Sequence, residues 1–151
     1  MNGASVTFIG NVTQSPELRF SQAGKAWCTF SVAVNEYGKD KSGEKTEHTS
    51  FFNCKLFGDA AENFAASVDK GNRVMVTGTL KMEKWTNKDG EEKTSPTVYV
   101  DEVGVSLRWA TTEIKRTAGN GGNGGNAARV PAAAGGPAAP TGFENEENPF
   151  V

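Results

Sequence analysis

Apolar residues at every second position are the feature of this chain that most constrains its fold. Segment 27–35 reads WCTFSVAVN, and its even-numbered residues, Cys28, Phe30, Val32 and Val34, are all apolar. Neighbouring side chains of a β-strand point to opposite faces, so this pattern predicts a strand with one face in a core. Segments 6–12, 49–58, 73–85 and 94–105 alternate similarly, which predicts a mainly β domain.

Glycine residues and charged stretches predict the turns and bends within and between these segments. In segment 73–85 we expect the inward residues to be Val74, Val76, Leu80 and Met82. Gly78 lies among them, where a strand can bend sharply. Residues 36–48 are charged and contain glycine, which predicts a loop, and the sequence NKDG at 87–90 predicts a hairpin turn.

One stretch has helical spacing instead. Residues 59–68 read DAAENFAASV and place apolar side chains at i, i+3, i+4 and i+7, namely Ala61, Phe64, Ala65 and Val68. Asp59 followed by Glu62 suggests a capping box, and Gly71 is expected to end the helix. The prediction is one short helix between two long strands.

This order of elements predicts an all-β domain. It matches the oligonucleotide/oligosaccharide-binding (OB) fold, a five-stranded Greek-key barrel with one short helix between strands 3 and 4. From pattern alone, an SH3-like barrel or a β-sandwich remains open.

Composition divides the chain into three parts. Residues 1–112 form the predicted OB domain. Residues 113–143 are rich in Gly, Asn, Ala and Pro, which predicts a flexible, disordered linker. Residues 144–151 read ENEENPFV and form an acidic tip with an apolar end.

Charge and cysteine content narrow the possible functions. The net charge is −2, and the acidic excess lies after residue 116, so a uniformly basic nucleic-acid binder is excluded but a basic path across a neutral domain is not. No apolar run of about 20 residues and no signal-peptide pattern is present, which predicts a cytoplasmic protein with reduced Cys28 and Cys54. His48 is the single histidine, and we expect no metal, no cofactor and no enzymatic activity.

The outward strand faces carry the functional signal. In TSFFNCKLFG, residues 49–58, the core set is Phe52, Cys54 and Leu56. Phe51 and Phe57 then share the outer face with Lys55. On segment 73–85 the residues expected outward include Arg73, Lys81 and Trp85, with Lys84 beside Trp85. Tyr37 is expected at the base of the loop that precedes segment 49–58. Aromatic rings among cations suit unpaired nucleobases and phosphates, although Phe51 or Phe57 packing under the helix or against another subunit is an alternative. Roles for Trp27 and Trp109 are left open.

Five blocks in this order, VTFIGNV, PELRF, LFGDAAEN, KGNRVMVTGTL and KMEKWTNKDGEEKT, resemble bacterial and phage single-stranded DNA-binding proteins (SSB) over residues 5–110. DEVGVSLRWATTEIKR looks closest to the branch of high-GC Gram-positive bacteria. The resemblance implies an OB-fold homotetramer that wraps single-stranded DNA during replication, recombination and repair.

The resemblance also implies roles for particular residues. Base stacking would fall to Tyr37, Phe51, Phe57 and Trp85, and Lys81 and Lys84 match basic positions of the family. Lys55 and Arg73 are added to the expected phosphate contacts because they lie on the outward strand faces. Tyr37 and Phe51 stand where the best-known members have tryptophan, Glu83 where some members are basic, and Phe52 where a family histidine makes subunit contacts.

The acidic tip also matches the SSB family, whose tails end in acidic residues followed by Pro-Phe and recruit replication and repair proteins. The corresponding residues are Glu144, Glu146, Glu147, Pro149 and Phe150. Val151 is a departure, because it carries the terminal carboxylate that the family places on phenylalanine.

Rival functions can be weighed by sequence. A protein-docking OB accessory subunit usually lacks an acidic Pro-Phe tip, and a cold-shock RNA-binding module is shorter. An OB-type nuclease needs carboxylates on barrel strands, whereas most carboxylates here are expected in loops.

Overall fold

The computed structural model describes residues 2–117 as a barrel with one helix. Its elements are β1 (Ala4–Val12), β2 (Glu17–Phe20), β3 (Ala26–Lys39), β4 (Lys45–Phe57), α1 (Asp59–Ser67), β5 (Arg73–Thr86) and β6 (Glu92–Val105). The five long alternating segments all form strands, as predicted. No helix in this part of the chain is long and apolar enough to cross a bilayer.

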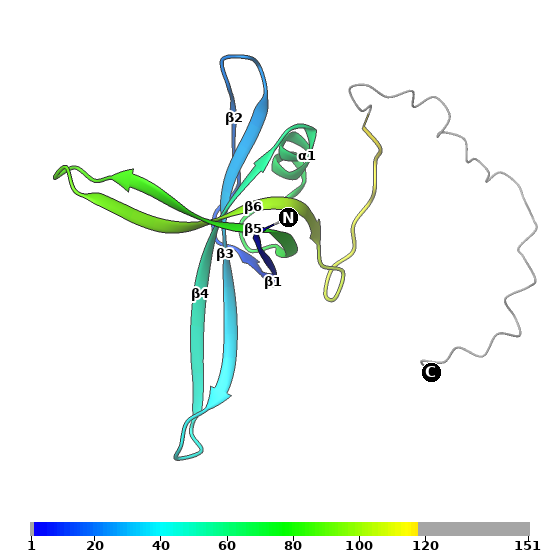
Figure 1. The fold of residues 1–151 in the computed structure, drawn as a ribbon. Helices are drawn as coiled ribbons and strands as arrows, with labels where there is room; N and C mark the ends of the chain where they lie inside the picture. The colour runs from blue at the N-terminus through cyan, green and yellow to red at the C-terminus, as the bar shows by residue number, and fades with distance from the viewer. Residues whose placement is uncertain (1, 118–151) are drawn as a thin grey trace, which may run out of the picture. The chain divides into compact units, whose positions relative to one another are not determined.

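The strands close into a barrel. Their order in the sheet is β1-β5-β6-β4-β3-β2, and an additional pairing of β1 with β3 joins the two sides. β2 pairs with β3 outside this closed circuit, so five long strands make the barrel and α1 connects the third of them to the fourth (Figure 1). The predicted OB-fold barrel is therefore confirmed.

The core lies inside the barrel and under α1. Val32 on β3 and Val74 and Val76 on β5 are fully buried. From α1, Phe64 packs onto Phe30 with ring centroids 4.4 Å apart, so the helix closes one end of the core. Burial of a side chain of this size contributes about 1.5–3 kcal/mol.

Phe52 keeps its predicted inward orientation. It packs against the core, and its ring stacks on buried Phe8 at 4.4 Å between centroids and 18° between planes. Cys54 and Leu56 are buried on the same face of β4. Burial raises the pKa of the Cys28 thiol to about 11 and that of Cys54 to about 12, so both are neutral side chains at physiological pH.

The predicted loop over residues 36–48 is wrong. β3 continues to Lys39 and β4 begins at Lys45, so these residues form a long hairpin arm with a short turn (Figure 1). The turn is held by Asp40, whose Oδ1 accepts hydrogen bonds from the Ser42 and Glu44 amides at 2.8 and 2.9 Å. Both faces of the arm are exposed, so no apolar alternation marks it as a strand.

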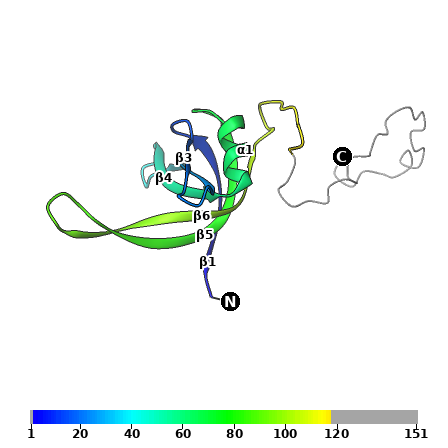
Figure 2. The same ribbon diagram turned by 90° about the horizontal axis from the view of Figure 1, so that it is seen from above.

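The same reason explains Met82. We expected it inside, but its side chain is 62% exposed. Beyond Leu80 the β5–β6 hairpin leaves the barrel as a second arm, so alternation no longer selects a buried face (Figures 1 and 2). The predicted turn at 87–90 is present, with the Gly90 amide bonded to the Asn87 carbonyl at 3.1 Å.

The ends of α1 differ from the prediction. The N-cap is Gly58 with φ of 83°, and no side chain caps the helix, because Asp59 already lies in the first turn. The helix ends at Ser67, and the Val68 amide bonds to the Phe64 carbonyl at 3.0 Å. Gly71 belongs to the following turn and does not end the helix.

Candidate nucleic-acid interface

Three aromatic side chains from three strands form a continuous row on the outside of the barrel. Trp27 on β3 lies directly opposite Phe57 on β4, with ring centroids 6.3 Å apart and planes 18° apart. Phe57 is followed by Tyr99 of β6 at 6.1 Å and 16°. We call Trp27, Phe57 and Tyr99 the aromatic row. Its middle ring is the most exposed, at 53%.

Cations lie at both ends of the aromatic row. The Arg19 guanidinium carbon is 5.5 Å from the Trp27 ring centroid. At the other end, the Lys81 ammonium lies 4.4 Å from the Tyr99 centroid and the Lys55 ammonium 5.7 Å from it. These are cation–π distances, so the flat faces and the positive charges belong to one surface.

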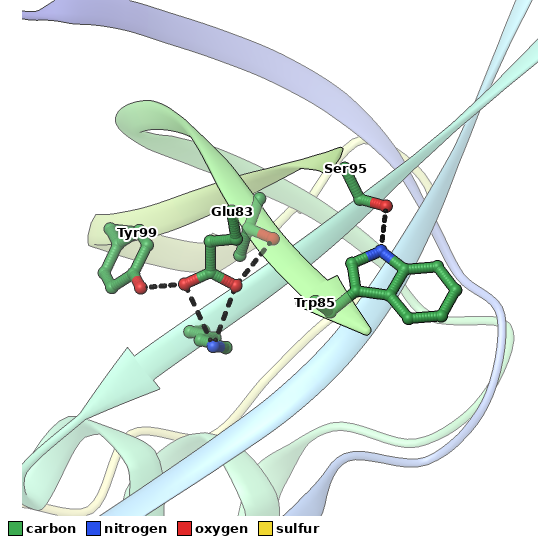
Figure 3. A network of polar contacts seen from close by, with 6 residues as sticks. Glu83, Trp85, Ser95 and Tyr99 are labelled. Carbon is green, nitrogen blue, oxygen red and sulfur yellow. Dashed lines mark hydrogen bonds and ion pairs between the residues drawn. The ribbon is translucent and has the colours of Figure 1, made fainter. Parts of the chain in front are cut away.

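Glu83 organises the Tyr99 end of the row, as Figure 3 shows. Its two carboxylate oxygens accept hydrogen bonds from the Lys55 ammonium at 3.1 and 3.0 Å. The Tyr99 hydroxyl donates to Oε1, and the Thr97 hydroxyl donates to Oε2 at 3.2 Å. One carboxylate thus joins side chains from β4, β5 and β6.

The protonation states follow from these contacts. Hydrogen bonds from Tyr99 and Lys55 lower the pKa of Glu83, and the same bond to Glu83 raises the pKa of Tyr99. At neutral pH Glu83 is therefore a carboxylate and Tyr99 a neutral phenol. The charge of Lys55 is compensated by an ion pair in which both side chains are about 30% exposed.

The other predicted stacking residues stand apart from the row. Tyr37 is 75% exposed and Phe51 66% exposed, both on the β3–β4 side of the molecule. Trp85 is 49% exposed on the β5–β6 arm, where its indole N–H donates to the Ser95 hydroxyl at 2.8 Å (Figure 3). All of these rings are accessible, as expected from the sequence.

The residues predicted to contact phosphate do not all lie at the aromatic row. Lys81 lies at the aromatic row, and exposed Lys84 is farther along the arm, 4.0 Å from Glu92. Arg73 is not brought to this surface. It begins β5, eight residues before Lys81, or about 26 Å along an extended strand. Its guanidinium carbon lies 4.7 Å from the Trp109 ring centroid.

Sequence reasoning missed two members of this surface. Tyr99 follows buried Val98 on β6, so period-two alternation alone would have placed it outside. Its neighbours could not be found in that way, because the β4–β6 pairing is parallel and joins segments distant in sequence. Arg19 gave no signal beyond its charge. The predicted tip residues, Glu144 to Val151, and most of the linker lie outside the described residues.

Comparison with known proteins supports a common family. Residues 3–106 match the model of the single-strand binding protein family. The chain is 42% identical over 119 residues to a single-stranded DNA-binding protein of Mycolicibacterium smegmatis, covering 78% of this chain and 72% of that protein. It is 40% identical over 118 residues to one from Paenarthrobacter aurescens, covering 77% and 69%.

A solved structure agrees with these relatives. The small single-stranded DNA-binding protein from Streptomyces coelicolor matches with a TM-score of 0.61 and 29% identity, over 71% of this chain and 97% of that one. The sequence blocks, the barrel and the aromatic face thus lead to one conclusion: the chain belongs to the single-strand binding protein family.

Proposed function

We propose that this chain binds single-stranded DNA without sequence preference and protects it during replication, recombination and repair. The observation that carries the proposal is a barrel face on which accessible aromatic rings lie among cations, with Phe57 near its centre. Every nucleobase has a flat π-face, and stacking on an aromatic side chain contributes about 1–3 kcal/mol per base. A binder of this kind needs no cofactor and performs no catalysis.

The residues divide into two roles. Base stacking is assigned to Tyr37, Phe51, Phe57 and Trp85, and phosphate contact to Lys55, Lys81, Lys84 and Arg73. Lys81 is the best-placed cation, since it lies against a ring of the aromatic row. Lys55 must leave its ion pair with Glu83 to bind a phosphate. Arg73 would contact a phosphate only where the DNA single strand continues around the barrel.

Oligomer and partners are the finer part of the proposal. A homotetramer would allow one single strand to pass over several barrels in the cytoplasm of a bacterium or of a phage-infected host. The acidic tip, ending in Pro149, Phe150 and Val151, would recruit replication and repair proteins. These assignments are supported by the family resemblance of the sequence.

The proposal is tested by titrating the full chain with a poly-dT oligonucleotide while following tryptophan fluorescence. We expect strong quenching by the single strand, little by a duplex of equal length, and weaker binding as salt rises. Trp85→Ala should remove part of the quenching and Trp109→Ala much less. An equal response to single strand and duplex, or no response, would contradict base stacking.

A further inference from the structure

We propose that Trp27 and Tyr99 bind nucleobases together with Phe57, so that the aromatic row is one continuous stacking site for single-stranded DNA. This inference rests on the proposed function and adds two residues to it. Neither ring was assigned from the sequence pattern, and each comes from a strand other than that of Phe57.

The arrangement of the rings is the first support. The planes of neighbouring rings differ by only 18° and 16°, so the row presents aligned aromatic surfaces across β3, β4 and β6. Trp27 and Tyr99 are half-buried, and each is fixed on one side by Phe57. Little side-chain freedom is left to lose when a base stacks on them, and this favours binding.

Charge complementarity identifies the occupant as a nucleic-acid single strand. Arg19 lies at the Trp27 end of the row and Lys81 at the Tyr99 end. Arg19 also contacts Glu17 at 3.0 Å, which lowers its net contribution. Within the described residues, no carboxylate lies at ion-pair distance from Lys81, so its charge is available for a phosphate beside a base stacked on Tyr99.

Glu83 acts as a positioning residue for this site. Its carboxylate accepts hydrogen bonds from both the Tyr99 hydroxyl and the Lys55 ammonium (Figure 3). These bonds hold the phenol ring in line with Phe57. Tyr99 therefore combines a ring for stacking with a hydroxyl for anchoring. These two functions can be separated by substitution.

The experiment measures poly-dT affinity of full-length variants at one fixed salt concentration. We expect Tyr99→Leu and Trp27→Leu each to weaken binding by about five- to a hundredfold, because each removes one stacking ring. Tyr99→Phe should stay within a few-fold of the wild type, since it keeps the ring. Leu107→Ala, which truncates an exposed side chain outside the row, is the control and should leave the affinity unchanged.

A second measurement keeps the proposal testable if a leucine variant fails to fold. In a Trp85→Phe, Trp109→Phe double variant, Trp27 is the single tryptophan, and we expect poly-dT to quench it. Unchanged affinity of both leucine variants, or an unquenched Trp27, would overturn the inference. If the wild type still bound poly-dT, either of these outcomes would overturn only the roles of Trp27 and Tyr99 and would leave the proposed function intact.

Oligomer size, measured by light scattering, tests whether a second copy of the chain, and not DNA, covers the aromatic row. If the row instead packed against a second copy of the chain, Tyr99→Leu would change the oligomer size while DNA affinity per folded oligomer stayed constant. That outcome would also overturn the inference. Absence of poly-dT binding by the wild type would instead remove the proposed function itself.

Discussion

Two groups of aromatic side chains on this protein differ in how much protein surrounds them. Phe57 stacks on both Trp27 and Tyr99, so these rings form one row across three barrel strands. Within the described residues, Tyr37 and Phe51 are exposed and stack on no other ring, and Trp85 is held by one hydrogen bond to Ser95. The first group is a preformed surface, whereas the second consists of separate rings.

The difference predicts how each group contributes to binding. A ring already fixed by neighbours loses little conformational entropy when a base stacks on it. An isolated, exposed ring must be ordered in the complex, so part of its stacking energy is offset. The row should therefore provide most of the affinity per ring, and the separate rings should extend the contact along the strand.

The largest expected effect comes from Gly78→Ala. A Cβ at this position would clash with the Tyr99 carbonyl oxygen and approach the Val100 Cα at 3.0 Å, both backbone atoms of β6. We expect a loss of about 1–3 kcal/mol in the free energy of unfolding. Tyr99 would be displaced as well, so affinity for poly-dT should also fall.

Gly104→Ala is the matched control, because the space around its Cβ is open and it lies on the strand paired with β5. Denaturant unfolding and poly-dT titration of both variants make the comparison. Equal stability of the two variants would mean that the close approach of β5 and β6 at Gly78 has no energetic importance.

The next effect is on DNA binding alone, without the loss of stability expected for Gly78→Ala, and it separates the two phenylalanines of β4. Phe57→Leu removes the middle ring of the row and should cost up to about 3 kcal/mol of poly-dT binding, whereas Phe51→Leu should cost about 1 kcal/mol. Leucine keeps an apolar side chain in both variants. Fluorescence titration measures the two affinities, and a greater loss for Phe51 would reverse the proposed ranking of fixed and separate rings.

The smallest effect concerns salt dependence. Glu83→Gln removes the carboxylate that compensates Lys55, so Lys55 becomes available to a phosphate. The slope of log affinity against log salt should steepen by about 0.7 for single-stranded DNA. Glu113→Gln removes the same charge outside the barrel strands and should leave the slope unchanged. A slope that stays constant in Glu83→Gln would show that removing the Glu83 charge adds no phosphate contact by Lys55.

Much of the fold could be predicted from local sequence. Alternation in segments such as WCTFSVAVN marks strands because burial of one face imposes a period of two. The helical spacing of Ala61, Phe64 and Val68 likewise predicts the α1 face that is buried. Prediction failed for residues 36–48 and for Met82, where the hairpins leave the barrel and neither face is buried.

The candidate site was only partly predictable, for a related reason. Phe51, Phe57 and Trp85 could be placed outside by counting along their own strands. Nothing local indicates that Glu83 compensates Lys55, because the two residues lie on different strands and meet only in the folded chain.

Within the barrel, the sequence by itself determined which segments become strands and helix, and which side chains face away from the core. Only the tertiary structure decided that Trp27, Phe57 and Tyr99 form one row. The physical reason is that barrel closure and the parallel β4–β6 pairing set which residues of distant strands lie side by side. Those pairings depend on the packing of the whole core and are not encoded in any single segment.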